Sequence, residues 1–252
     1  ASDISALVAE QAFDYLDAPP SRVSAPHTPV PYSRALEPLF VPSKEKIVAA
    51  ALAAGFDGDA PLHGEGGQWR IHGLTIEDHR AHDTMSAHDA VVLSSNIGIA
   101  KVAAAVGTEH IGAFLQELGL IDSTEPWSSP NALWLSNGVG LRGTPLALAN
   151  AYRELARSIR GQGPIDPFIA QRVRDSLIAA VNEGTGQRAR VEQAQVAGKT
   201  GTSRLATGYG TWFIGMSPAA NPQHIVVVYA EVEEGHGGHT AAPTFARIAS
   251  QL

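Results

Sequence analysis

The strongest hydrophobic pattern in the chain follows Ser43, in the stretch S-K-E-K-I-V-A-A-A-L-A-A-G, which is apolar almost throughout after its first turn. Serine caps helix N-termini well, and Glu45 falls in the first turn, where negative charge is favoured. Gly55 supplies a stop signal. The pattern therefore predicts a buried helix from Ser43 to Gly55.

Helical patterns continue through the middle of the chain. A helix, a break at 94–96 and a second helix are predicted over 85–106. The remaining predicted helices are 108–118, 146–159, 175–181 and 243–252. Seven prolines between residues 18 and 42 indicate an extended loop instead, because proline removes a backbone donor, and 56–75 is predicted as loop and turns.

Three strands are predicted near the C-terminus, at 194–202, 210–216 and 225–232. The turn P-A-A-N-P between the last two implies antiparallel pairing. Sheet-forming ends around a helical middle indicate an α+β fold: an antiparallel β-sheet flanked by helices, with an inserted all-helical lobe. We expect a single domain over 1–252, with a sheet lobe of about 1–42 and 190–252 and a helical lobe of about 43–189.

Composition narrows the function classes. The 252 residues carry a net charge of −7 and few basic clusters, which argues against nucleic acid or an acidic membrane surface as a partner. The absence of cysteine excludes disulfides, thiolate metal sites and a cysteine nucleophile. No apolar run is long enough to span a bilayer, and the abrupt opening Ala1-Ser-Asp is not that of a signal peptide, so we expect a processed chain.

The charged residues single out the stretch V-A-G-K-T-G-T-S at 196–203. The chain has only four lysines among its 18 basic residues, and one of them is Lys199. Lysine can lose its proton when it is buried, whereas arginine cannot. Thr200 and Thr202 offer hydroxyls to a carboxylate, and Gly201 lets a ligand's backbone approach closely. The alternative is a plain strand end that runs into a turn.

A second candidate is Ser43 with Lys46. Residues three apart share a helix face, so the Lys46 amine would lie beside the Ser43 hydroxyl. Serine needs an adjacent base to act as a nucleophile, and a neutral lysine can serve if burial and another cation lower its pKa. The alternative is a capping serine beside a solvated lysine.

A third candidate is Ser94-Ser95-Asn96, at the predicted break between two apolar helices. Ser94 could relay a proton between two lysines, and Asn96 could bind a substrate amide. The alternative is that Ser95 or Asn96 only caps the second helix.

The order Ser-x-x-Lys, Ser-x-Asn, Lys-Thr-Gly is far more specific than any one of its members. In this order the chain resembles the transpeptidase domain of penicillin-binding proteins, among the serine acyl-transferases that also include serine β-lactamases. The resemblance runs from about residue 4 to the C-terminus and is nearest to the monofunctional, class B type. Further segments similar to that family are S-S-N-I-G-I-A-K at 94–101, S-N-G-V-G-L-R-G-T-P-L at 136–146, E-G-T-G-Q-R-A at 183–189 and G-G-H-T-A-A-P-T-F-A-R-I-A at 237–249.

The resemblance implies a β-lactamase/transpeptidase-like fold and D-Ala-D-Ala transpeptidation of peptidoglycan stem peptides. Ser43 would be the nucleophile, Lys46 its base and Ser94 the proton relay. Asn96 would anchor a substrate amide. The terminal carboxylate would be held by the residues of the third motif: Lys199, Thr200, Gly201 and Thr202.

The implied setting is the bacterial periplasm or the outer face of the cytoplasmic membrane, with any membrane anchor absent from this chain. No cofactor or metal is expected. The implied partners are stem peptides, β-lactam antibiotics and other cell-wall synthesis proteins.

Two positions depart from the family pattern. The family usually has glycine before the nucleophile and an apolar residue before the motif lysine, where this chain has Pro42 and Glu45. Glu45 beside Lys46 would favour the charged form of the lysine, which is wrong for a base. The alternatives are therefore a D,D-carboxypeptidase, a β-lactamase-type hydrolase, or a non-catalytic homologue that acts as a scaffold or β-lactam sensor.

Overall fold

The computed structural model describes residues 44–117, 133, 137 and 144–252. The chain divides into two compact units, 1–34 and 35–252, and every described residue lies in the second. Within the described residues, no helix has both the length and the apolar character needed to cross a membrane.

Among the residues that the structure describes, four helices form the helical part of this unit: α2 (Lys44–Ala53), α3 (Ala87–Val92), α4 (Asn96–Val106) and α5 (Thr108–Glu117). The side chain of Ser86 caps α3 and that of Ser95 caps α4. The chain between Leu93 and Ser95 leaves α3 and enters α4, and it turns through Ser94 with a φ of 60°. A positive φ is uncommon for a residue other than glycine, so the predicted break is a defined turn.

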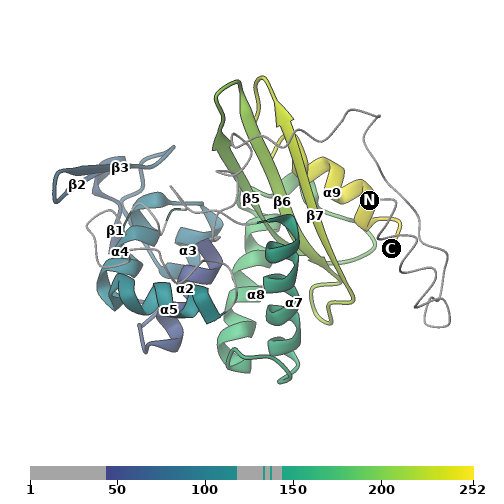
Figure 1. The fold of residues 1–252 in the computed structure, drawn as a ribbon, viewed down its shortest axis with the longest axis horizontal. Coiled ribbons are helices and arrows are strands. Elements are labelled where there is room, and N and C mark those ends of the chain that lie inside the picture. The colour runs from purple at the N-terminus through teal and green to yellow at the C-terminus, as the bar shows by residue number, and fades with distance from the viewer. Residues whose placement is uncertain (1–43, 118–132, 134–136, 138–143) are drawn as a thin grey trace. The chain divides into compact units, whose positions relative to one another are not determined.

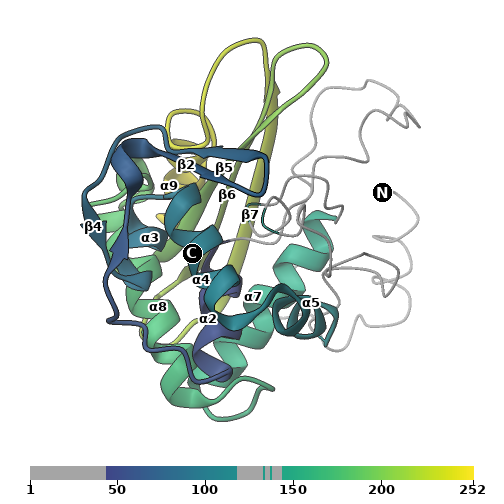
Figure 2. The same cartoon turned by 90° about the vertical axis from the view of Figure 1, so that its left-hand side faces the viewer.

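The sheet has the order β5 (Ala197–Arg204), β6 (Tyr209–Ser217), β7 (His224–Val232), and both pairs are antiparallel. Helices α7 (Pro145–Ile159) and α8 (Pro167–Asn182) pack on one side of it, and α9 (Ala241–Ala249) packs on the other (Figures 1 and 2). Successive side chains of a strand point to opposite faces. Accordingly Trp212 and Ile214 join the core under α7 and α8, while Phe213 joins Phe245 of α9.

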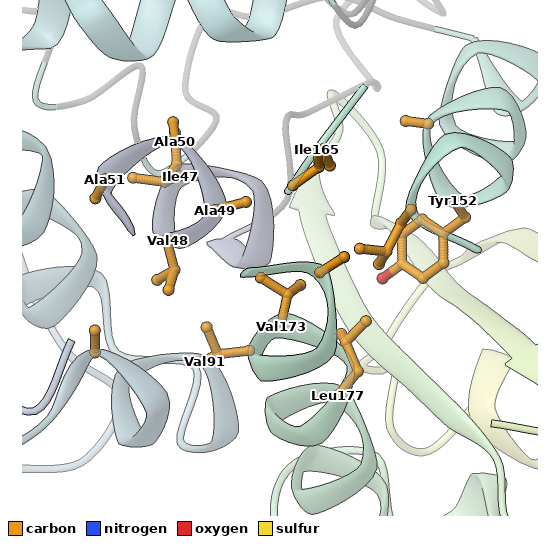
Figure 3. Packing of buried hydrophobic residues seen from close by; sticks show 14 of the residues in the cluster. Ile47, Val48, Ala49, Ala50, Ala51, Val91, Tyr152, Ile165, Val173 and Leu177 are labelled. Atoms are coloured by element: carbon orange, nitrogen blue, oxygen red, sulfur yellow. The ribbon is translucent and has the colours of Figure 1, made fainter. Parts of the chain in front are cut away.

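Helix α8 joins the sheet to the helical part, because it contacts β5, α2 and α3. Figure 3 shows Val48 of α2 pointing toward Val91 of α3 and Val173 of α8, and all three belong to the same hydrophobic cluster as Leu177 of α8 and Tyr152 of α7. The first turn of α2 is therefore fixed against the same helix that supports β5. This arrangement holds the two parts of the candidate site in one core.

The predicted helix after Ser43, the helix–break–helix, the helices at 108–118 and 146–159, the closing helix and the antiparallel strands are confirmed, with shifted ends. The start predicted for the helix at 175–181 is wrong, because α8 begins at Pro167. Asp166 caps it by accepting from the backbone N–H groups of Phe168 and Ile169. Aspartate before proline is a standard helix start, and this signal was missed.

The prediction that 56–75 is only loop and turns is also wrong. Strand β2 (Gln68–Ile71) pairs with β3 (Leu74–Glu77) in an antiparallel hairpin. Its turn residues His72 and Gly73 both have positive φ, 47° and 79°. This is the geometry that matches the twist of a tight hairpin. Two-residue strands β1 (Leu62–His63) and β4 (Thr84–Met85) pair alongside it, and short helical turns occur at Glu65–Gly67 (η2) and Gln187–Ala189 (η3).

Candidate active site

Ser94 lies at the centre of the candidate site and contacts two lysines from different parts of the fold. Its hydroxyl oxygen accepts from Lys199 Nζ on β5 at 3.0 Å. Its backbone carbonyl accepts from Lys44 Nζ on the first turn of α2. The left-handed backbone of Ser94 thus exposes both of its oxygens to lysine amines. A residue held in this sparsely populated region is often found at a functional site.

Lys199 is buried on β5 and is surrounded by hydroxyl groups. Besides Ser94 it contacts the hydroxyls of Thr185 and Thr200, both at 3.3 Å, and the carbonyl of Thr200 at 3.2 Å. Thr185 and Thr200 bond to each other at 2.7 Å. Burial lowers the pKa of Lys199 to about 8, against the opposing charge of Glu45. Lys199 therefore lies where its charge can act on a ligand at this edge of β5.

Lys44 lies on the side of α2 that faces the turn between α3 and α4. In addition to the Ser94 carbonyl, its amine donates to Asn96 Oδ1 at 2.6 Å. Burial and the charge of Lys199 lower the pKa of Lys44 to about 7, while Asp78 and Glu45 act in the opposite direction. A lysine in this state is partly neutral near neutral pH and can accept a proton.

Lys46 lies elsewhere. Its amine is buried without a hydrogen-bond partner and stands 5.8 Å from the centre of the Tyr152 ring. Burial lowers the pKa of Lys46 to about 8, against the charge of Glu45. The Glu45 carboxylate is also buried and accepts from the Tyr152 hydroxyl at 2.5 Å. Burial and this carboxylate raise the pKa of Tyr152 well above its ordinary value.

Asn96 is the first residue of α4, and its side-chain amide is engaged at both ends. Its oxygen accepts from Lys44, and its nitrogen donates to the carbonyl of Glu77 at 2.7 Å. The turn itself is held by Asp78 at the end of β3. The Asp78 carboxylate accepts from the hydroxyl of Ser95 at 2.6 Å and from the backbone N–H groups of Asn96 and Ile97. A carboxylate is stabilising at a helix N-terminus, so Asp78 fixes the turn that presents Ser94.

The remaining residues of the third motif follow Lys199 along β5. Thr202 is exposed, and its hydroxyl oxygen accepts from the backbone N–H of Gly237 at 3.0 Å, which leaves its own proton free to donate. A Cβ atom at Gly237 would lie 2.4 Å from the Gly201 carbonyl, so the close approach of these two segments requires glycine at 237. At Gly201 a Cβ would meet only Trp212, at 3.5 Å, so the protein's own packing does not require glycine there.

The structure thus brings four predicted site residues together. Lys44 links Ser94 to Asn96, and Lys199 links Ser94 to Thr200. Gly201 and Thr202 follow on the same strand. The structure does not bring Lys46 to them. Ser43 lies outside the described residues. The roles predicted for all of these residues stay predictions. Lys44 meets the carbonyl of Ser94, which accepts but cannot donate, so this conformation holds no continuous relay between the two lysines.

Sequence reasoning missed three residues of the site. Lys44, one of the chain's four lysines, stands inside the S-K-E-K motif, but the spacing of three from Ser43 favours Lys46 and gives Lys44 no role. Thr185 belongs to the noted segment E-G-T-G-Q-R-A, where its position beside a Gly gave the only signal. Asp78 lies 17 residues before Ser95, and strand β4 and helix α3 stand between them, so no local pattern connects the two.

Comparison with known proteins decides the family. The model of the penicillin binding protein transpeptidase domain matches residues 43–250. The chain belongs to this family. A transpeptidase relative is the "Probable peptidoglycan D,D-transpeptidase PbpC" of Pseudomonas aeruginosa, which is 33% identical over 260 residues. That alignment covers 86% of this chain and 46% of the relative.

Solved transpeptidase structures agree with this fold. The apo transpeptidase domain of Burkholderia pseudomallei penicillin-binding protein 3 aligns with a TM-score of 0.73 at 25% identity, over 86% of this chain and 80% of that one. The expected β-lactamase/transpeptidase fold is therefore confirmed. This chain spans about half the length of the curated transpeptidases it matches, 46% and 56% for two of them.

A second family matches the start of this transpeptidase chain. The model of the transketolase C-terminal domain matches residues 1–47. Over 52 residues, 21% of this chain and 15% of the relative, the chain is 56% identical to the beta subunit of an acetoin:2,6-dichlorophenolindophenol oxidoreductase from Bacillus subtilis. The two family models overlap at 43–47, the stretch that holds Ser43 and Lys46. The Ser-x-x-Lys motif thus lies in a stretch that matches both families.

Proposed function

We propose that this chain is a serine-type D,D-transpeptidase that cross-links peptidoglycan stem peptides through an acyl-enzyme, in the periplasm or cell-wall space. The observation that carries the proposal is the position of Ser94 between the half-buried Lys44 and the buried Lys199, at the edge of β5. Family membership supports it, because the relatives that match carry names of peptidoglycan D,D-transpeptidases.

The proposed nucleophile is Ser43, which directly precedes α2. Its oxygen bonds to the carbonyl carbon of the penultimate D-alanine, and its proton passes to a lysine amine. The bond to the terminal D-alanine breaks, and the leaving amine takes that proton. An amine of a second stem peptide then displaces the serine oxygen, which recovers a proton. A β-lactam would stop after the first step, because its leaving amine stays attached.

The third motif would hold the terminal carboxylate. Thr202 has a free hydroxyl proton at the exposed end of the site, and Lys199 and Thr200 lie before it on the same strand. Hydrogen bonds to a charged partner are the strong ones, and they stabilise by roughly 1.5–3 kcal/mol each. Asn96 uses one N–H and one lone pair within the protein and keeps the others for a substrate amide.

Two observations favour the non-catalytic alternative. The predicted base Lys46 lies away from Ser94, and the stretch that holds Ser43 also matches a different family. A scaffold or β-lactam sensor needs the fold but not the nucleophile. We therefore choose a test that separates the alternatives.

The test is to incubate the chain with benzylpenicillin and follow its intact mass over hours. We expect a persistent one-to-one adduct that maps to the peptide holding Ser43 and disappears in Ser43→Ala. A hydrolase would show little adduct and would consume excess drug. A folded chain that forms no adduct and leaves the drug intact would contradict the proposal and support the non-catalytic alternative.

A further inference from the structure

We propose that Lys44, rather than Lys46, is the lysine that takes the proton from the nucleophile, and that Lys46 is a buried packing residue. This inference rests on the proposed function, which identifies the reaction but leaves the base open. It concerns two residues of one helix turn, and α2 cannot present both of them to the same place.

Helix geometry separates the two side chains. At 3.6 residues per turn, residues two apart differ in direction by about 200° around the axis. The Lys44 amine meets the turn of Ser94 and Asn96 at one side of α2. The Lys46 amine therefore lies on the other side, over the ring of Tyr152. To exchange them, α2 would have to rotate by half a turn out of the core in which Val48 packs toward Val173 of α8 (Figure 3).

The surroundings of Lys46 leave no room for chemistry. It borders a cavity of about 10 Å³, enough for no more than about one water molecule. The apolar residues that line this cavity are Ala49, Phe114, Ala151, Leu155, Ile165 and Val173. A stem peptide or a β-lactam cannot enter such a space, so a proton on Lys46 has no path to either.

The surroundings of Lys44 suit a base. Its amine already gives two N–H groups to the Ser94 carbonyl and Asn96 Oδ1, which fixes its orientation. In the neutral amine the remaining position is a lone pair that can accept the hydroxyl proton of the nucleophile. After the serine oxygen has bonded to the carbonyl carbon, the same proton returns to the departing amine. Lys199 shares Ser94 with Lys44, and its charge opposes a second charge so close to it.

The first experiment compares Lys44→Met with Lys46→Met as a matched pair, and uses Lys101→Met as a control outside the site. The rate of covalent labelling by a fluorescent penicillin is measured for each, with thermal unfolding to check the fold. We expect Lys44→Met to lose about 10²–10⁴-fold in rate, the usual contribution of a general base. We expect Lys46→Met and Lys101→Met to label like the unmodified chain.

Lys44→Arg guards against loss of structure in Lys44→Met, because arginine keeps the charge and the donors but cannot give up its proton. It should fold and still fail to label. If Lys46→Met abolishes labelling while Lys44→Met and Lys44→Arg retain it, the inference is wrong.

The second experiment does not need acylation. With ¹³C-labelled lysine the chain gives one side-chain signal for each of its four lysines, which single Lys→Arg variants assign. We expect Lys199→Met to raise the titration midpoint of Lys44 and to leave that of Lys46 unchanged. A shift at Lys46 with none at Lys44 would overturn the inference. If the unmodified chain is never labelled by penicillin, the proposed function fails, and this titration still decides which lysine belongs to the site.

Discussion

At the scale of single residues, the site depends on how Ser94 uses its two oxygens. The hydroxyl contacts Lys199 and the carbonyl contacts Lys44, so one residue links a strand of the sheet to the first turn of α2. Lys199 is buried and Lys44 is half-buried, and the charge of Lys199 lowers the pKa of Lys44. The protonation of Lys44 is therefore the quantity on which activity should depend.

We predict that the acylation rate rises with pH through about 7, the pKa of Lys44. Below this value Lys44 carries a proton and cannot accept another, and above it the amine is neutral. Of the groups around it, Lys199 lowers this pKa, and Asp78 and Glu45 raise it. The measurement is the rate of penicillin labelling from about pH 5 to about pH 9. The expected midpoint lies well below the ordinary lysine pKa of about 10.4.

Asp78→Asn provides the control for this profile. It removes a charge that favours protonated Lys44, so the midpoint should move to lower pH. A flat profile, or a midpoint that does not move in this variant, would contradict the assignment.

At the scale of elements, α2 shows which parts of the fold its sequence could predict. The cap, the first-turn acid and the glycine stop gave its ends, and Thr144 before Pro145 and the break at 94–96 did the same for α7 and α4. The orientation of α2 was not predictable, because alanine and valine follow its first turn on every side. Without an apolar face, spacing alone chose Lys46.

The position of Lys44 gives a prediction for position 41, which lies three residues before it and holds valine. Residues three apart share a helix face, so a serine introduced there would offer Lys44 a second hydroxyl besides that of the proposed nucleophile Ser43. We expect Val41→Ser to be labelled by penicillin faster than the unmodified chain, with the adduct at residue 41.

The control for this variant is Val41→Thr, which keeps the β-branched shape and has a more hindered hydroxyl. Mapping of the labelled peptide in Val41→Ser combined with Ser43→Ala identifies the oxygen that reacts. Unchanged labelling in Val41→Ser would show that the spacing from Lys44 does not control the nucleophile.

At the scale of the whole molecule, the chain has two compact units and matches two families. The units meet after residue 34, and the two family matches overlap at 43–47. Residues 43–250 match the transpeptidase family, residues 1–47 match a transketolase domain, and residues 1–34 form a unit of their own. The contacts described for the candidate site lie within the second unit. The expectation that 1–42 completes the sheet lobe stays a prediction.

We predict that a chain beginning at Ala35 keeps both the fold and the chemistry of the longer one. The reason is that the transpeptidase family model matches residues 43–250, which all lie in the unit 35–252 together with the described core around α8. Thermal unfolding and penicillin labelling of the two chains should agree. A shorter chain that unfolds at a clearly lower temperature would show that the first 34 residues complete the transpeptidase fold after all.

The left-handed backbone at Ser94 also limits how this site can change over generations. With a φ of 60°, the position disfavours β-branched residues, so a single-base change to threonine would keep the hydroxyl but strain the turn. Asparagine and glycine accept this backbone, yet neither replaces the hydroxyl that meets Lys199. We therefore expect folded variants with reduced penicillin labelling to carry substitutions around Ser94 rather than at Ser94 itself.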